Sequence, residues 1–148
     1  MKTYFFTEKG VVKAIDGINL EIGQHETLGL VGESGSGKSV TALSIMRLVP
    51  HPGRIVEGQV LLEGDDLLKK TKEDMIQVRG CRMSMIFQDP TSSLNPVLNV
   101  GEQIGEVIRL HGRTEDESDT RKRIIEILEE VGIPDASTRH RHYPHQLS

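Results

Sequence analysis

The first third of the chain alternates between runs of apolar residues and polar breaks. Residues 11–22 partly alternate apolar with polar, which predicts strands with one solvated face. Residues 27–31 form a short apolar run (T-L-G-L-V) whose length favours a fully buried strand of a parallel sheet. A glycine- and serine-rich loop follows, and then a helix over residues 40–48, which Pro50 stops. Strand, glycine loop and helix in this order are half of a βαβ unit, so the pattern predicts an α/β fold.

The middle of the chain predicts shorter elements. Residues 54–62 contain Gly58 and are closed by a Gly-Asp pair, which favours short antiparallel strands. Thr71 and Asp74 are spaced as a helix start, which predicts a helix over residues 72–79. Residues 83–87 (M-S-M-I-F) are a second candidate for a buried strand.

The last third predicts two amphipathic helices. Asn99 and Glu102 can cap a helix that runs to His111. Thr114 and Glu117 form a second capping-box pattern. The helix that they open has one apolar face, formed by Ile124, Ile127, Leu128 and Val131.

Composition narrows the class of protein. The 148 residues are 36% hydrophobic and 27% charged, with a net charge of −4 and one cysteine. This is the composition of a soluble domain in a reducing compartment. No apolar run approaches the ~20 residues that span a bilayer, which argues against direct membrane insertion. The mild acidity argues against nucleic acid as the main partner. The C-terminal segment R-H-R-H-Y-P-H, residues 139–145, lacks the spacing of a zinc site and is expected to be a solvated basic segment.

Residues 32–39 (G-E-S-G-S-G-K-S) match the phosphate-loop pattern G-x-x-x-x-G-K-[ST]. Glycines let consecutive backbone N–H groups approach a polyphosphate, and the helix that follows directs its positive end at the phosphates. Lys38 is expected to lie on the β- and γ-phosphate oxygens, and the Ser39 hydroxyl to ligate Mg²⁺. The predicted nucleotide-binding residues of the loop are Gly32, Glu33, Ser34, Gly35, Ser36, Gly37, Lys38, Ser39 and Val40.

A phosphate loop that hydrolyses nucleotide also needs a carboxylate at the end of a neighbouring strand. Asp89 is the nearest candidate, but Gln88 separates it from the apolar run and Pro90 follows it. We therefore do not expect Asp89 to fill that role.

Several longer strings resemble one protein family. "LGLVGESGSGKSVTALSIMRL", "GQVLLEGDDLL", "MSMIFQDPTSSLNPVLNVGEQIGEVIRLH" and "YPHQLS" together are similar to the ATP-binding subunits of ABC transporters of the oligopeptide and dipeptide importer branch. The resemblance implies a P-loop NTPase core with an antiparallel β region and an α-helical subdomain. It implies antiparallel strands and the phosphate-loop core over residues 1–88, and the Q-loop with part of the helical subdomain over residues 89–148.

The resemblance also implies roles for single residues. Gln88 is similar to the Q-loop glutamine, which ligates Mg²⁺, senses the γ-phosphate and acts with Lys38 in catalysis. Phe5 is similar to the aromatic residue that stacks on adenine, with Tyr4 as the alternative. ATP and Mg²⁺ are the implied cofactors.

The implied partners are the transmembrane permease subunits, which the loop over residues 89–99 would face. A second ATP-binding subunit, identical or different, would complete a dimer. The protein would then be peripheral at the cytoplasmic face of the cell membrane. Two other classes stay open: an ABC-type ATPase of DNA repair or chromosome organisation, and a stand-alone, non-catalytic nucleotide-binding module.

The chain is expected to stop before the Walker B strand, because Ser148 matches only the first serine of the family's signature motif. A full-length member would be an ATPase that couples hydrolysis to the uptake of di- and oligopeptides. The 148-residue chain alone is expected to bind ATP weakly, without turnover.

Overall fold

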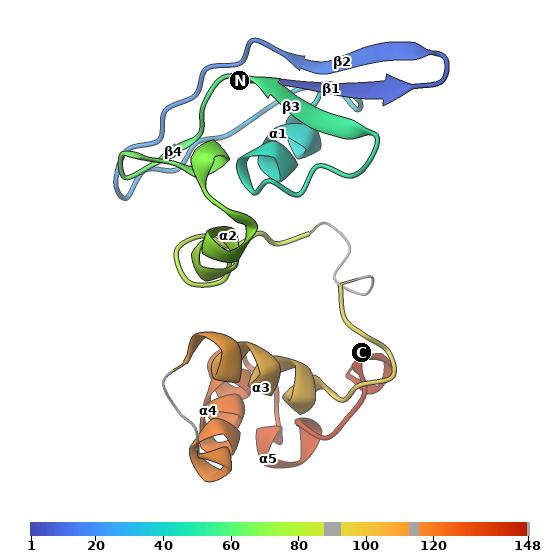
Figure 1. The fold of residues 1–148 in the computed structure, drawn as a ribbon. Helices are drawn as coiled ribbons and strands as arrows, with labels where there is room; N and C mark the ends of the chain where they lie inside the picture. Colours follow the sequence, from blue (N-terminus) through green and yellow to red (C-terminus); the bar gives the residue numbers. More distant parts are fainter. Residues whose placement is uncertain (88–92, 113–115, 148) are drawn as a thin grey trace. The chain divides into compact units, whose positions relative to one another are not determined.

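The computed structural model describes residues 1–87, 93–112 and 116–147. These residues divide into two compact units, Met1–Met85 and Ile86–Ser148, each of which is described by itself (Figure 1). The predicted boundary between residues 88 and 89 stays a prediction.

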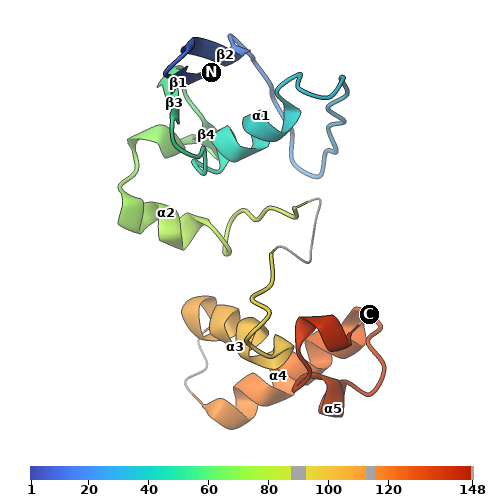
Figure 2. The same ribbon diagram turned by 90° about the vertical axis from the view of Figure 1, so that its right-hand side faces the viewer.

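The first unit is built on a three-stranded antiparallel sheet. Its strands are β1 (Lys2–Thr7), β2 (Gly10–Asp16) and β3 (Gly53–Glu57), in the spatial order β2-β1-β3. Helix α1 (Lys38–Ile45) lies against one face of this sheet (Figures 1 and 2).

The contact between sheet and helix is partly polar. Thr3 is fully buried on the inner face of β1, and its hydroxyl is 2.8 Å from the Ser44 hydroxyl of α1. Ile15 of β2 lies opposite Thr3 and is 5% exposed. Because Ser44 Oγ also donates to Val40 O at 2.7 Å, the buried hydroxyls are satisfied and α1 is fixed against the sheet.

A hairpin and a short helix complete the first unit. Strands β4 (Leu61–Leu62) and β5 (Asp65–Asp66) pair across Glu63 and Gly64, which both have positive φ. The 3₁₀ helix η1 (Leu67–Lys69) and helix α2 (Lys72–Val78) follow. The capping box of Thr71 and Asp74 is present, as predicted. A small core of Leu67, Met75 and Val78 holds these elements together.

Two strand predictions were wrong. Residues 27–31 form no strand, and Leu30 and Val31 are 41% and 95% exposed. Residues 83–87 form no strand either, and only Met83 makes an isolated bridge, to Arg79. A strand requires a neighbour to accept and donate its backbone hydrogen bonds. Within the described residues neither run has such a neighbour, because the sheet is formed by β1, β2 and β3.

The second unit is helical. Helix α3 (Val100–His111) packs against α4 (Glu117–Glu130), followed by the short helix α5 (Ala136–Arg139) and the 3₁₀ helix η2 (Pro144–Gln146). Its core consists of Val100, Ile124, Leu128 and Ala136.

The ends of these helices follow the predicted caps in part. The capping box of Asn99 and Glu102 is present at the start of α3, as predicted. Helix α4 is capped by Asp116, whose side chain accepts from Ser118 N, while Thr114 lies outside the described residues. Val131 was predicted on the buried face but is 68% exposed, because it lies after the last residue of α4.

The C-terminal basic segment was predicted to be solvated, and this is wrong for its backbone and for one histidine. His140 is 8% exposed, and its carbonyl accepts from Gly101 N at 2.7 Å. The His142 carbonyl accepts from Val100 N at 2.9 Å. The segment is therefore fixed on the first turn of α3, where helix N–H groups have no partner of their own.

Within the described residues, no helix is both long and apolar enough to cross a membrane.

Candidate functional site

The glycine-rich loop before α1 begins with a tight turn. Ser36 N donates to Glu33 O at 3.2 Å, and Gly35 within this turn has φ +82°. An L-residue adopts that conformation only with strain, so the turn explains the glycine at position 35. The chain reverses here and the loop becomes compact.

Gly37 joins the loop to both α1 and the sheet. Its φ is +92°, and a Cβ placed on it would lie 2.7 Å from Ala14 O of β2. Only glycine fits this approach, so Gly37 seats the loop on the backbone of β2. Helix α1 begins at the next residue, and Thr41 N donates to Gly37 O at 2.8 Å.

The N-terminal end of α1 has the properties of an anion-binding site. The N–H groups of Lys38, Ser39 and Val40 precede the first helical hydrogen bond of Thr41, so they have no partner within the helix. The helix dipole adds partial positive charge at the same end. Ser39 is exposed and its hydroxyl lies in this first turn. The donor set therefore fits phosphate oxygens.

Lys38 spans the loop. Its Nζ donates to Gly32 O at 2.6 Å and Glu33 O at 2.7 Å, and lies 3.3 Å from Ser36 Oγ. The ammonium group therefore cross-links the loop and places a positive charge beside its backbone. A phosphate there meets a cation and several backbone N–H groups, a combination that favours polyphosphate.

Of the two predicted metal ligands, Ser39 and Gln88, only Ser39 lies within the described residues. Ser39 provides one hydroxyl oxygen, while Gln88 and the rejected Asp89 lie outside the described residues. Within the described part of the chain no group of three or more histidine, cysteine or acidic side chains could hold a metal ion. A Mg²⁺ ion that arrives with its nucleotide needs only one or two protein ligands, so Ser39 suits that mode of binding.

The two candidate aromatic residues lie on opposite faces of β1. The Phe5 ring packs on Gly53, where an added Cβ would lie 2.7 Å from Phe5 Cε1. Tyr4 Oη donates to Asp16 Oδ1 at 2.5 Å, and Lys13 Nζ lies 5.5 Å from the centre of the Tyr4 ring. The Asp16 carboxylate raises the pKa of Tyr4 because it stabilises the protonated phenol. Adenine stacking by Phe5 stays a prediction.

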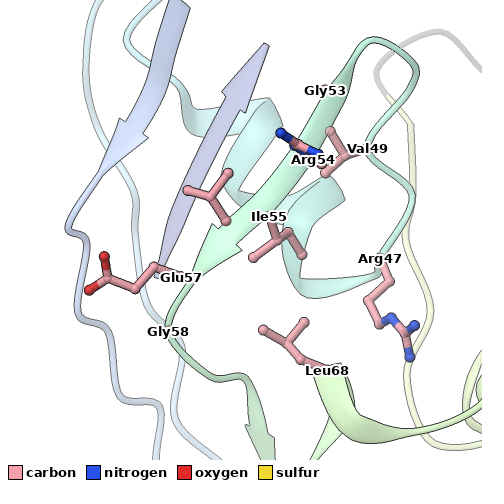
Figure 3. A pocket seen from close by; sticks show the side chains of 9 residues that line it. Arg47, Val49, Gly53, Arg54, Ile55, Glu57, Gly58 and Leu68 are labelled. Atoms are coloured by element: carbon pink, nitrogen blue, oxygen red, sulfur yellow. The ribbon is translucent and has the colours of Figure 1, made fainter. Parts of the chain in front are cut away.

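An open depression of about 370 Å³ lies beside β3 (Figure 3). None of its lining residues belongs to the loop over residues 32–40, so it is not the candidate site. It is lined by Arg47, Val49, Gly53, Arg54, Ile55, Val56, Glu57, Gly58 and Leu68.

In the second unit, the end of the predicted permease-facing loop is held by one side chain. Gln103 Oε1 accepts from Asn95 N at 2.8 Å, and its Nε2 donates to Asn95 O and Leu98 O, both at 3.0 Å. Val97, between these anchor points, is 74% exposed. Gln103 therefore fixes the described end of this loop, and the apolar Val97 is exposed between the anchor points. No pattern in the sequence marks Gln103.

A family model described as "ABC transporter" matches residues 15–148. The chain belongs to the ABC transporter family. The predicted family is confirmed, and its phosphate-loop pattern falls on the loop described above.

Three relatives illustrate the similarity. The chain is 48% identical to the "Oligopeptide transport ATP-binding protein AppD" of Bacillus subtilis, covering 100% of this chain and 45% of the relative. It is 44% identical to the "Probable peptide ABC transporter ATP-binding protein y4tR" of Sinorhizobium fredii, with 100% and 44% coverage. It is 43% identical to the "Dipeptide transport ATP-binding protein DppD" of Lactococcus lactis, with 97% and 41% coverage. The chain thus spans less than half the length of these curated relatives.

Two solved structures of an ABC cassette, MJ0796, share the fold. The dimeric cassette has a TM-score of 0.82 at 24% identity, covering 99% of this chain and 60% of that chain. The form described as post-hydrolysis and "bound to ADP and Pi" has a TM-score of 0.77 at 23% identity, with 100% and 63% coverage. The predicted P-loop NTPase fold class of an ABC cassette is confirmed.

Proposed function

We propose that the protein containing this chain is the ATP-binding subunit of an ABC importer, and that it couples ATP hydrolysis to the uptake of di- and oligopeptides. The loop geometry carries the nucleotide part of this proposal: Lys38 Nζ donates to Gly32 O at 2.6 Å within the loop, and the first N–H groups of the helix that follows have no helical partner. The names of the similar proteins, which refer to oligopeptide, dipeptide and peptide transport, support the substrate class.

Different residues of the chain would bind different parts of ATP. The backbone N–H groups of Lys38, Ser39 and Val40 would donate to phosphate oxygens, and the Lys38 ammonium would neutralise charge between the β- and γ-phosphates. Mg²⁺ bound with the nucleotide supplies a second positive charge on the same oxygens. Ser39 and Gln88 would hold it through their side-chain oxygens, and Phe5 would stack on the adenine ring.

The proposed partners follow from the same family. The loop over residues 89–99 would face the transmembrane permease subunits, and Val97 within it is exposed. A second ATP-binding subunit would complete the dimer, and the complex would lie at the cytoplasmic face of the cell membrane.

Binding of MgATP to the purified chain, measured by isothermal titration calorimetry, tests the nucleotide part. We expect weak binding, no turnover, and at least about a tenfold loss of affinity on Lys38→Ala, because a charge-assisted contact to phosphate is removed. Lys9→Ala is the matched control, since Lys9 is an exposed lysine at the tip of the β1–β2 hairpin. Equal affinities of wild type and Lys38→Ala would refute the assignment. Mg²⁺-dependent hydrolysis that Lys38→Ala abolishes would refute the absence of turnover.

The transport part requires a separate measurement on the full-length protein. Reconstituted with its permease subunits in liposomes, it is expected to take up labelled di- or oligopeptide only in the presence of ATP. ATP hydrolysis that DNA stimulates and the permease does not would instead assign the protein to the DNA-associated class.

A further inference from the structure

Helix α1 ends in a motif whose left-handed position usually holds glycine but here does not. Leu48 N donates to Leu43 O at 2.8 Å and Arg47 N to Ser44 O at 3.0 Å, the hydrogen-bond pair of a Schellman motif. The residue in the left-handed conformation of this motif is usually glycine, but here it is Arg47, with φ +53°. A strained residue persists only when the structure around it over-determines its conformation.

The Arg47 side chain reaches the segment before α2. Its Nη1 donates to Leu67 O at 2.8 Å and Lys70 O at 2.7 Å, the carbonyls at the start of η1 and just after it. Figure 3 shows Arg47 at the end of α1, with Leu68 of η1 below it. Leu67 is fully buried, so this contact anchors α1 to a fixed point of the unit's core.

Arg79 makes the reciprocal connection. It follows the last residue of α2, and its Nε donates to Met46 O at 2.9 Å and its Nη2 to Arg47 O at 3.0 Å. These carbonyls are at the negative end of the α1 dipole, where a guanidinium is favourable. Arg47 and Arg79, which we call the arginine clasp, therefore tie the C-terminal end of α1 to η1 and to the end of α2.

The clasp matters because α1 has only 8 residues. A helix this short is not stable alone and takes its position from tertiary contacts. Its N-terminal end carries the phosphate loop and its C-terminal end is in the clasp. After Arg79 the chain runs through residues 80–87 to Gln88.

We propose that Arg47 and Arg79 are positioning residues, which hold α1 in place for phosphate binding and transmit nucleotide binding at its N-terminal end to the segment that leads to Gln88. The inference rests on the proposed nucleotide binding. If Arg47 and Arg79 only stabilised the fold, removing them would lower its stability without changing how nucleotide binding at one end of α1 affects the other end.

The test compares the 148-residue chain with three variants by hydrogen–deuterium exchange, with and without MgATP. Arg79→Met removes one half of the clasp. Arg47→Gly removes the other half but relieves the positive-φ strain, so the C-terminal turn of α1 keeps a favourable residue. Arg82→Met is the matched control, because Arg82 is three residues from Arg79 and pairs with the exposed carboxylates of Glu63 and Asp65.

In the wild type and in Arg82→Met, MgATP is expected to slow exchange both in the loop over residues 33–41 and in residues 79–85. In Arg79→Met and Arg47→Gly the slowing at residues 79–85 is lost, and the dissociation constant of MgATP rises about fivefold, the lower range for coupled sites. Slowing at residues 79–85 that persists at the wild-type level in both variants overturns the proposal.

A measurement without nucleotide distinguishes a failure of the proposed clasp from a failure of the proposed nucleotide binding. Without ATP, loss of the clasp is expected to speed exchange of the Thr41 and Met46 amides of α1 about fivefold in both variants. Unchanged rates for these amides in both variants overturn the clasp, whatever the result with ATP. Absence of any MgATP effect on residues 33–41 in the wild type would instead count against the proposed function.

Discussion

The contact between Gly37 and β2 allows a quantitative test of how the phosphate loop is seated. Gly37→Ala introduces two costs. An L-residue at φ +92° is strained, by roughly 1–2 kcal/mol. The new Cβ would also lie 2.7 Å from Ala14 O, a backbone atom that cannot rotate away, and relieving such an overpacked contact costs about 1–3 kcal/mol. The expected loss is about 3 kcal/mol.

Gly35→Ala is the matched control for this substitution. Gly35 has a similar φ of +82°, but an added Cβ would meet nothing within 4 Å. It therefore carries the backbone strain without the contact, and the expected loss is about 1–2 kcal/mol. The difference between the two variants isolates the contact with β2.

Native-state hydrogen exchange of the Met46 amide, which donates to Ala42 O at 3.0 Å, measures the opening of α1 in each variant. A loss of about 3 kcal/mol corresponds to roughly a hundredfold faster exchange, against about tenfold for Gly35→Ala. If the Gly37 variant exchanges no faster than the Gly35 variant, β2 does not hold the loop, and the reasoning about its seating is wrong.

Two further predictions concern local contacts. The Thr71 hydroxyl and N–H donate to the Asp74 carboxylate and hold its pKa below the usual value. The ionised carboxylate therefore stabilises α2 at pH values above the pKa of Asp74 in the unfolded chain. This contribution is lost as the pH falls through the lower pKa of the folded state. An NMR titration of Asp74 is expected to show a midpoint below about 3.9, and Thr71→Val is expected to raise it; an unchanged midpoint contradicts the capping box as its cause. In the second unit, Gln103→Met is expected to speed exchange of the Asn95 amide about tenfold, since its acceptor is lost. Glu106→Met, an exposed site one turn along α3, serves as control, and equal rates in both variants would contradict the anchoring role of Gln103.

Helix boundaries followed from the sequence because their causes are local. Thr71 with Asp74, and Asn99 with Glu102, satisfy helix N–H groups three residues away, so the spacing alone predicts the start of α2 and of α3. The end of α1 was predicted less well. It comes at Ile45 rather than at Leu48, because the Schellman motif with Arg47 ends the helix first.

The strand errors have a different physical origin. An apolar run such as residues 27–31 indicates that its side chains favour burial. It does not indicate whether another strand lies beside it. Val31 is 95% exposed in this structure because the antiparallel sheet is completed by β1, β2 and β3 without it. The three-stranded sheet pairs β1 with β3 across some fifty residues, and no local pattern encodes that pairing.

The difference between local and long-range contacts also decides which site residues the sequence predicts. Phosphate is bound by consecutive backbone N–H groups, so the glycines and Lys38 must be contiguous and leave a recognisable string. Arg47 instead donates to carbonyls 20 and 23 residues away, and Arg79 to carbonyls 33 and 32 residues back. Any residue has a carbonyl, so the acceptors carry no signature. Arg47 and Arg79 therefore emerge only from the folded structure, where Arg47 occupies the left-handed position that ends α1.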